Sequence, residues 1–279
     1  MAATLVGATA AHAATTVNIS TNIPYYSSNG VAQVLDSYVP SDAKPGSPAV
    51  IYVHGGGWAA GDKSRWGDWP QKTAANMGYP TFNINYVLNS PNPSWEQYVD
   101  VANAIAWVKA HAATYSIDPN RIAVIGESAG GQLAELAGTF PASAQYRPKV
   151  VISLSGISDL PLLASDAGCQ TVACTLTTTL TQTLAAMVQN NLTKVSYAAS
   201  PQTWINASPV TYVDASDTPM FLINSTNELT PLDQLTSLQN ALTAHGVAVN
   251  TLRLPGTQHA VDYMPTAAWP IMQYLSSHL

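Results

Sequence analysis

A serine stands at the centre of the pentapeptide Gly126-Glu127-Ser128-Ala129-Gly130, which has the pattern G-x-S-x-G. A serine on a sharp turn between a strand and a helix has its hydroxyl group held clear of the backbone, where it can act as a nucleophile. The helix that follows would present free N–H groups where negative charge develops. G-x-S-x-G is common by chance, so this interpretation needs support from the rest of the chain.

Three consecutive glycines stand in the motif HGGGW at residues 54–58, directly after the apolar run of residues 49–53. Glycines leave their N–H groups unshielded, so that a substrate carbonyl group can approach closely. Acyl transfer requires such rigid donors, aimed at the oxyanion that forms in the reaction. We therefore predict an oxyanion hole made by the N–H groups of Gly56, Gly57 and Ala129.

Of the six histidines, His259 is placed best to act as a general base. It follows the alternating stretch of residues 249–254, which is typical of a strand, and it lies downstream of Ser128. An imidazole titrates near neutral pH and therefore suits proton transfer to and from a serine. His54 is expected to be a structural residue of the glycine motif. The alternative for His259 is an ordinary histidine of a surface loop.

In this order, the motifs resemble those of the α/β-hydrolase superfamily, and more narrowly of its HGGG-type esterase and lipase branch, which includes small secreted carbohydrate and feruloyl esterases. The resemblance extends from about residue 22 to the end of the sequence. Weaker supporting stretches lie at residues 23–26, 35–40, 61–63, 85–86, 118–122 and 207–210. The resemblance implies a serine esterase with Ser128 as the nucleophile and His259 as the base.

The acid of the expected triad departs from the pattern of this family. The family places Asp in the turn after the strand expected at residues 220–224, and Asn227 stands there instead. Asn can orient an imidazole but supplies no charge, whereas Glu228 has the charge and a longer reach. We predict Glu228 as the acid, with Asp233 and Asp159 as alternatives. Glu228 could also serve only to open the following helix.

These residues imply a secreted serine hydrolase that cleaves small or polymer-linked carboxylic esters through an acyl-enzyme, with no metal or organic cofactor. Two alternatives stay open. An amidase or peptidase on the same fold would use the same groups. A non-catalytic binding protein would explain why Asn227 replaces the expected acid.

Strands that alternate with helices predict an α/β fold, with a mostly parallel, doubly wound central sheet and a small cap insertion. Strands at residues 16–20 and 31–39 are expected at an antiparallel edge. A long amphipathic helix is predicted over residues 93–115. Another helix is expected to begin at Pro231 and to end at Gly246. The other expected strands are residues 49–53, 80–86, 122–125, 150–156, 220–224 and 249–254.

Residues 159–206 interrupt this alternation and are the expected cap insertion. An apolar stripe recurs there every four residues, at Leu176, Leu180, Leu184 and Val188. We expect this stripe to pack on the main domain. The alternative is that part of it lines the acyl or alcohol pocket.

Trp58 directly follows the three glycines and is expected to flank the site as part of the substrate pocket, whereas Trp66 and Trp69 are expected in the core. Cys169 and Cys174 are the only cysteines and are separated by four residues. In an exported protein they would form a local disulfide. Two free thiols are the alternative, and nothing at ligand spacing indicates a metal site.

Charged residues make up only 9% of the chain, and the net charge is −6. The ten basic residues are scattered, so the sequence offers no patch for nucleic acid or for an anionic membrane. Residues 1–13 are small and apolar and end in Ala-His-Ala, as before a signal-peptide cleavage site, although no basic segment precedes them. They are too few to span a bilayer. We therefore expect a secreted protein with one domain at residues 14–279, or else a flexible tail at residues 1–13.

Overall fold

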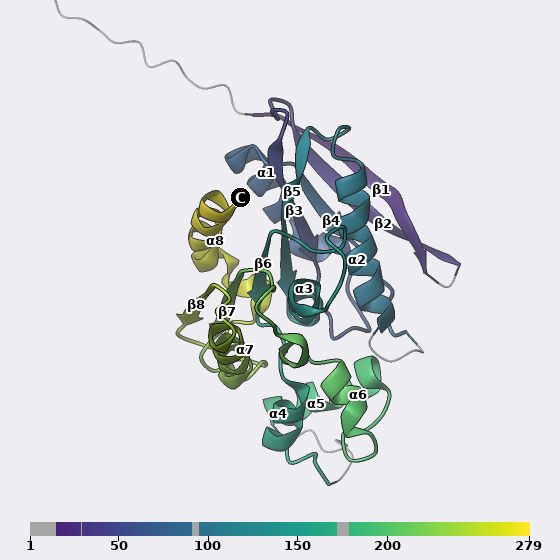
Figure 1. The fold of residues 1–279 in the computed structure, drawn as a ribbon, viewed down its shortest axis with the longest axis vertical. Helices are drawn as coiled ribbons and strands as arrows, with labels where there is room; N and C mark the ends of the chain where they lie inside the picture. The colour runs from purple at the N-terminus through teal and green to yellow at the C-terminus, as the bar shows by residue number, and fades with distance from the viewer. Residues whose placement is uncertain (1–14, 29, 91–94, 172–178) are drawn as a thin grey trace, which may run out of the picture.

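A mostly parallel sheet forms the centre of the structure (Figure 1). The computed structural model describes residues 15–28, 30–90, 95–171 and 179–279. Within these ranges, eight strands pair in the order β1-β2-β4-β3-β5-β6-β7-β8, and β2 runs antiparallel to both of its neighbours. The strands are β1 (Val17–Ser28), β2 (Val31–Pro40), β3 (Ser47–Val53), β4 (Thr81–Ile84), β5 (Ile117–Glu127), β6 (Val150–Leu154), β7 (Met220–Ser225) and β8 (Val249–Leu254).

Helices cover both faces of this sheet. They are α1 (Trp69–Met77), α2 (Trp95–Ala110), α3 (Ala129–Thr139), α4 (Leu160–Asp166), α5 (Leu180–Met187), α6 (Pro201–Asn206), α7 (Leu232–Ala244) and α8 (Met264–His278). Shorter turns are the 3-10 helices η1 (Lys63–Trp66), η3 (Pro209–Tyr212) and η4 (Ala260–Tyr263), and the π-helix η2 (Val188–Thr193).

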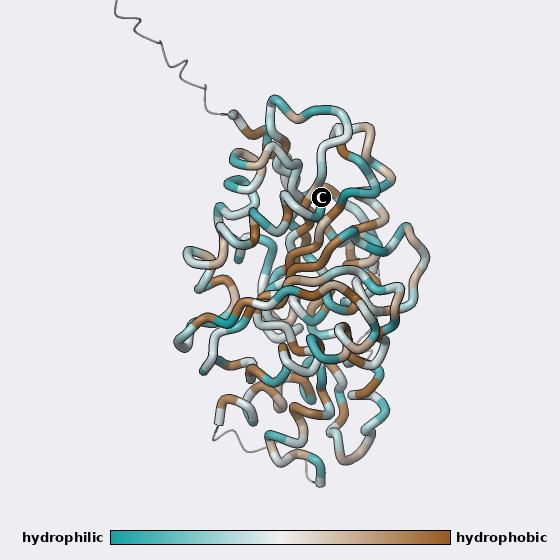
Figure 2. Tube along the Cα trace, turned by 60° about the vertical axis from the view of Figure 1, so that its left-hand side comes forward, coloured by the Kyte–Doolittle hydropathy of each residue, from teal (hydrophilic) through white to brown (hydrophobic). Residues whose placement is uncertain are grey.

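The alternation of side chains along β3 shows how the two faces are filled. Ile51 and Val53 pack on one face in a cluster with residues of α2, α3 and α7. Val50 and Tyr52 point to the other face, where they meet Trp66 of η1 and residues of α8. Because both faces are covered, the central strands are apolar at nearly every position. Figure 2 shows hydrophobic residues concentrated along these strands. The α/β fold with a doubly wound, mostly parallel sheet is therefore confirmed.

The boundaries of some elements differ from the prediction. Helix α2 ends at Ala110 rather than at residue 115. His111 N–H still donates to the carbonyl oxygen of Trp107 (3.0 Å), as in a helix, but Ala112 N–H donates to that of Lys109, three residues back, and the chain turns (3.3 Å). Helix α7 begins after Pro231, and Gly246 follows its end with φ of +75°, as the sequence indicates.

The predicted insertion folds into α4, α5, η2 and α6, which lie together at one end of the molecule (Figure 1). Leu184 and Val188 of the apolar stripe are buried in a cluster that includes Trp58 and Ala129 of the main domain. Leu180 is 56% exposed, so the prediction that it belongs to the buried stripe is wrong. It is the first residue of α5 and does not belong to this cluster.

Several predictions concern residues outside the described ranges, namely the signal segment at residues 1–13, Leu176 of the stripe, and Cys174 of the disulfide. Cys169 itself is buried, in the same cluster as Trp58. In the part of the chain that the structure places, no helix combines the length and the apolar composition needed to cross a bilayer.

Candidate active site

Ser128 forms a tight elbow between strand β5 and helix α3. Its backbone has φ of +54° and ψ of −120°, a conformation that costs a non-glycine residue about 1–3 kcal/mol. Two bonds hold it there: Ser128 N–H donates to the carbonyl oxygen of Leu154 (2.7 Å), and Gln132 N–H donates to that of Ser128 (3.1 Å). The residue is only 7% exposed. The elbow therefore stores strain at the predicted nucleophile.

The glycines on either side of the elbow allow a close backbone approach. A Cβ atom on Gly126 would collide with the carbonyl group of Gly130. A Cβ atom on Gly130 would collide with the carbonyl oxygens of Val53 and His54, at the end of β3. Backbone atoms cannot move aside as a flexible side chain can. The two glycines therefore let the elbow pack directly against the start of the HGGG loop.

The HGGG loop uses one of its three glycine N–H groups for its own attachment. Gly55 N–H donates to Oε1 of Glu127 (2.8 Å), the residue directly before Ser128. The carbonyl oxygen of Gly55 accepts a hydrogen bond from Nδ1 of His54 (2.7 Å). The carbonyl oxygen of Gly56 accepts from the N–H groups of two residues further along the loop, Ala59 and Ala60 (3.3 and 3.1 Å).

These carbonyl bonds orient the two remaining glycine N–H groups. A trans peptide unit is planar, so its N–H points opposite to its C=O. The N–H groups of Gly56 and Gly57 therefore point away from the bonds that hold the loop. Within the described ranges, neither these two groups nor the N–H of Ala129, at the start of α3, donates a hydrogen bond. This leaves the predicted oxyanion-hole donors without a partner in the described part of the chain.

Glu127 and His54 support this loop from behind. The buried carboxylate of Glu127 also forms an ion pair with Arg65, whose side chain is 41% exposed. The His54 ring stacks on Tyr86, with 4.4 Å between centroids, and burial lowers the pKa of His54. A neutral His54 can donate from Nδ1 to Gly55, so its role is structural, as expected. Sequence reasoning missed the pairing of Arg65 with Glu127, although an acidic residue inside the motif was a visible signal.

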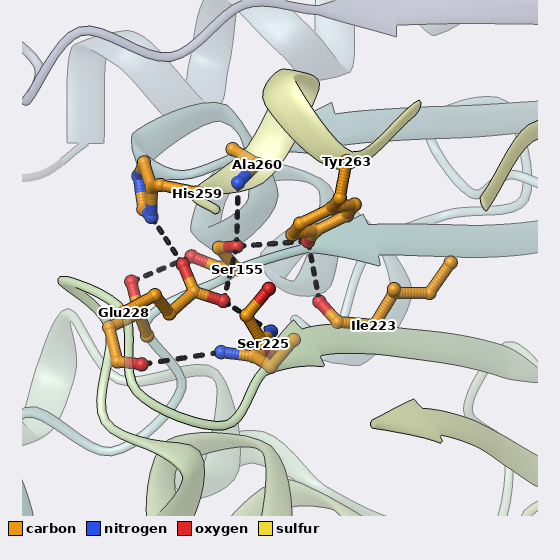
Figure 3. Close-up of polar contacts among 9 residues, drawn as sticks. Ser155, Ile223, Ser225, Glu228, His259, Ala260 and Tyr263 are labelled. Atoms are coloured by element: carbon orange, nitrogen blue, oxygen red, sulfur yellow. Dashed lines mark hydrogen bonds and ion pairs between the residues drawn. The ribbon is translucent and has the colours of Figure 1, made fainter. Parts of the chain in front are cut away.

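The predicted base and the predicted acid meet in the structure (Figure 3). Nδ1 of His259 forms a hydrogen bond with Oε2 of Glu228. The carboxylate is fully buried, whereas the imidazole is 19% exposed. The other carboxylate oxygen, Oε1, accepts from Oγ of Ser155 (2.9 Å) and from Ser225 N–H (2.7 Å). These two donors fix the position of the buried carboxylate.

The alternative acids lie elsewhere. Asn227 is exposed, and its side-chain nitrogen lies 3.5 Å from Oγ1 of Thr226. Asp159 caps helix α4 and accepts from Ser237 (2.7 Å). Asp233 lies beside Asp166, and burial together with this neighbour raises its pKa to about 6. The structure therefore brings only Glu228, among the predicted acids, to His259.

Ser155 links the acid to the loop that carries His259, a role that the sequence analysis missed. Its hydroxyl group accepts from Ala260 N–H (3.0 Å) and lies 2.9 Å from the hydroxyl oxygen of Tyr263 (Figure 3). Tyr263 in turn donates to the carbonyl oxygen of Ile223 (2.8 Å), and burial raises its pKa well above the usual value. A serine at the carboxyl end of the strand predicted at residues 150–156 was the available signal.

The end of β6 also brings the serine elbow and the histidine loop together. Leu154 accepts from Ser128 N–H, and the next residue, Ser155, accepts from Ala260 N–H, directly after His259. Within the part of the chain described, the Ser128 hydroxyl forms no hydrogen bond. Ser128, Glu228 and His259 thus follow the carboxyl ends of three parallel strands of one sheet, β5, β7 and β8.

Trp58 is placed differently from the expectation. It is fully buried, with φ of +61°, and its indole N–H donates to Oε1 of Gln132 (3.0 Å). It packs with side chains of the insertion such as Leu192 and Trp204. A fully buried indole of this kind fixes the loop after the glycines and offers no accessible surface to a substrate. The expectation of a pocket residue gives way to a packing role.

The match to a family model covers most of these elements. The model named BD-FAE matches residues 35–242, about three quarters of the chain. The chain belongs to the BD-FAE family. This membership agrees with the resemblance to the esterase and lipase branch of the α/β hydrolases.

Curated relatives of this BD-FAE member carry esterase names. The probable carboxylic ester hydrolase LipM of Mycobacterium tuberculosis is 29% identical, over 79% of this chain and 51% of that protein. The esterase LipQ of the same organism is 28% identical, over 88% of this chain and 58% of that protein. The chain thus spans about half to three fifths of the length of these relatives.

Solved structures support the fold. A truncated carbohydrate esterase from gut microbiota has a TM-score of 0.77 at 20% identity, covering 95% of this chain and 97% of that one. Esterase B of Lactobacillus rhamnosis has a TM-score of 0.72 at 20% identity, covering 95% and 88%. At this identity the likeness establishes the α/β-hydrolase fold.

Proposed function

We propose that this protein is a serine carboxylic-ester hydrolase that acts on small or polymer-linked esters through an acyl-enzyme on Ser128. One observation carries the proposal. His259 bonds Glu228 in a loop that is joined through β6 to a strained serine elbow, and the N–H groups of Gly56 and Gly57 in the neighbouring loop have no partner within the described ranges. The esterase names of the relatives support the same reaction class.

In the first half of the proposed reaction, Oγ of Ser128 attacks the ester carbonyl carbon while Nε2 of His259 takes the hydroxyl proton. Glu228 stabilises the imidazolium ion that forms. The carbonyl oxygen becomes an oxyanion and binds the N–H groups of Gly56, Gly57 and Ala129. The carbon–oxygen bond to the alcohol then breaks, and the alcohol leaves with the proton from His259.

In the second half, water takes the place of the alcohol. His259 removes a proton from the water molecule, which attacks the acyl-enzyme carbonyl carbon. The bond to Oγ of Ser128 then breaks, the serine recovers its proton from His259, and the carboxylic acid is released. The same N–H groups bind the oxyanion in both halves.

The test combines turnover with covalent labelling. The wild-type protein is expected to hydrolyse p-nitrophenyl acetate and to react with a fluorophosphonate probe, whereas Ser128→Ala should do neither. Survival of either activity in Ser128→Ala would refute the proposal, as would a wild-type protein that shows neither. Parallel assays on matched esters and anilides separate an esterase from an amidase. A series of acyl chain lengths, with acetylated sugars and feruloyl esters, defines the substrate.

We also propose that the protein is secreted, with cleavage after Ala13. The small apolar residues 1–13 with their Ala-His-Ala ending and the charged fraction of only 9% support this proposal. N-terminal sequencing of protein recovered from the culture medium should begin at Ala14. Full-length protein retained in the cells would contradict it.

A further inference from the structure

The insertion touches the glycine loop at Gly57, one of the residues of the proposed oxyanion hole. Asn191 lies in the π-helix η2, and its Nδ2 donates to the carbonyl oxygen of Gly57 (2.9 Å). The methyl group of Met187, at the end of α5, lies where a Cβ atom on Gly57 would stand. Two side chains of the insertion therefore meet the same glycine. Irregular π-helical turns of this kind are frequent at functional sites.

A second contact ties the next residue of the loop to the same part of the insertion. Nζ of Lys194, directly after η2, donates to Oδ1 of Asn89 (2.6 Å). Asn89 N–H in turn donates to the carbonyl oxygen of Trp58 (2.7 Å). The carbonyl groups of Gly57 and Trp58 are thus both held, one by η2 directly and one through Asn89.

The hydrogen bond from Asn191 matters because the residue that it holds, Gly57, is a glycine. The N–H group of Gly57 belongs to the peptide unit before its Cα, which the loop itself holds through the carbonyl group of Gly56. The peptide unit after the Cα can rotate freely in a glycine, which populates many backbone conformations. Asn191 removes this freedom, because its amide group fixes the carbonyl oxygen of Gly57. With both units held, the Gly57 N–H keeps one direction.

We propose that Asn191 is a positioning residue for the oxyanion hole, through which the insertion helps to keep the Gly57 N–H group in one direction. This inference rests on the proposed esterase function. It also assigns the insertion a role in catalysis beyond packing on the main domain.

The experiment compares two substitutions of Asn191 with a matched control. Asn191→Ala removes the donor, and Asn191→Asp removes it while keeping the size and shape of the side chain. Asn190→Ala changes the neighbouring, exposed asparagine of the same π-helix. Each full-length protein is assayed for kcat and KM on p-nitrophenyl acetate and for inhibition by an aryl trifluoromethyl ketone. That inhibitor adds to the serine hydroxyl group and places an oxyanion in the hole.

Loss of a whole oxyanion donor costs about 10²–10³ in kcat, so a misdirected donor should cost about tenfold. Both Asn191 variants are expected to lose about tenfold in kcat and to bind the ketone about tenfold more weakly, with KM within about twofold. Asn190→Ala should match the wild type. A purely structural role would lower the melting temperature without moving kcat or ketone affinity together.

Three results would overturn the inference: Asn191→Asp with wild-type kcat and ketone affinity, a loss confined to KM, or an equal loss in Asn190→Ala. If Asn191→Ala fails to fold, the shape-preserving Asn191→Asp decides the question. A wild-type protein without turnover or fluorophosphonate labelling would refute the proposed function itself. Normal wild-type activity with unaffected Asn191 variants would refute only this inference.

Discussion

Asn227 and Glu228 are consecutive in the chain, yet their side chains occupy opposite environments. The side chain of Asn227 is exposed and contacts its neighbour Thr226, whereas that of Glu228 is buried and bonds His259. The backbone of the turn explains the difference, because Asn227 N–H donates to the carbonyl oxygen of Gly256 (2.9 Å) and holds that residue on the outside.

This relationship predicts that Glu228, and not Asn227, supports turnover. Glu228→Gln should lower kcat by about 10²–10⁴-fold, since a neutral amide does not stabilise the imidazolium ion. Asn227→Ala is the matched control and should stay within about twofold of the wild type. Steady-state kinetics on p-nitrophenyl acetate checks both. Near-normal turnover in Glu228→Gln, with loss in Asn227→Ala, would show that the assignment is wrong.

Ser155→Ala should weaken both the acid and the histidine loop. The change removes a donor from the buried Glu228 and leaves Ala260 N–H without its acceptor. We expect a fall in kcat of about 10–100-fold, and a loss of stability of about 1–3 kcal/mol, the usual cost of a buried unsatisfied group. Kinetics and urea unfolding measure the two effects.

Tyr263→Phe provides the comparison for Ser155. It removes the hydroxyl group that contacts Ser155 and Ile223 but leaves the bond from Ser155 to Glu228 in place. Its stability should fall, with a smaller effect on kcat than that of Ser155→Ala. An effect on kcat as large as that of Ser155→Ala would mean that the contact with Glu228 is not the decisive one.

The ion pair between Arg65 and Glu127 should show unequal single-mutant effects. Arg65→Met leaves a fully buried carboxylate without its cation, at a cost of about 1–3 kcal/mol in the free energy of unfolding. Glu127→Gln keeps an acceptor for Gly55 N–H and should cost less, because the partly exposed Arg65 remains hydrated. Urea unfolding of both single variants and the double variant gives the coupling energy. Additive effects would show that the pair contributes nothing as a pair.

Glu135 should make stability depend on pH. Its carboxyl group is buried in α3 beside Ser153 and Ser158, and burial raises its pKa from 4.5 to about 7. The folded protein therefore binds an extra proton between pH 4.5 and about 7. The stabilisation by this proton is complete below pH 4.5 and is lost as the pH rises through about 7.

Glu135→Gln should remove this contribution. Between about pH 5 and about pH 8, the free energy of unfolding of the wild type should fall by up to about 3 kcal/mol more than that of the variant. The melting temperature of the wild type should therefore also fall more over this range. Asp42→Asn, an exposed carboxylate, is the control and should leave the wild-type slope unchanged. Equal slopes for Glu135→Gln and the wild type would contradict the prediction.

The sequence alone determined the parts of this protein that depend on local chemistry. The G-x-S-x-G and HGGG motifs, each after an apolar strand, indicated the α/β fold and the elbow at Ser128. The order of residues along the chain led to His259 as the predicted base. These features depend on backbone conformations that only a few residue types allow, so they leave a local trace in the sequence.

Tertiary structure decided which side chains meet. Asn227 and Glu228 looked nearly equivalent in sequence, and the direction of the turn separated them. Likewise, the residues around Arg65, Ser155 and Asn191 in the sequence do not indicate which side chains or carbonyl groups these three bond. Their contacts join residues 62, 73 and 134 positions apart. Such pairings follow from how strands are ordered in the sheet and how the insertion packs on it, and a sequence pattern of short range carries no record of either.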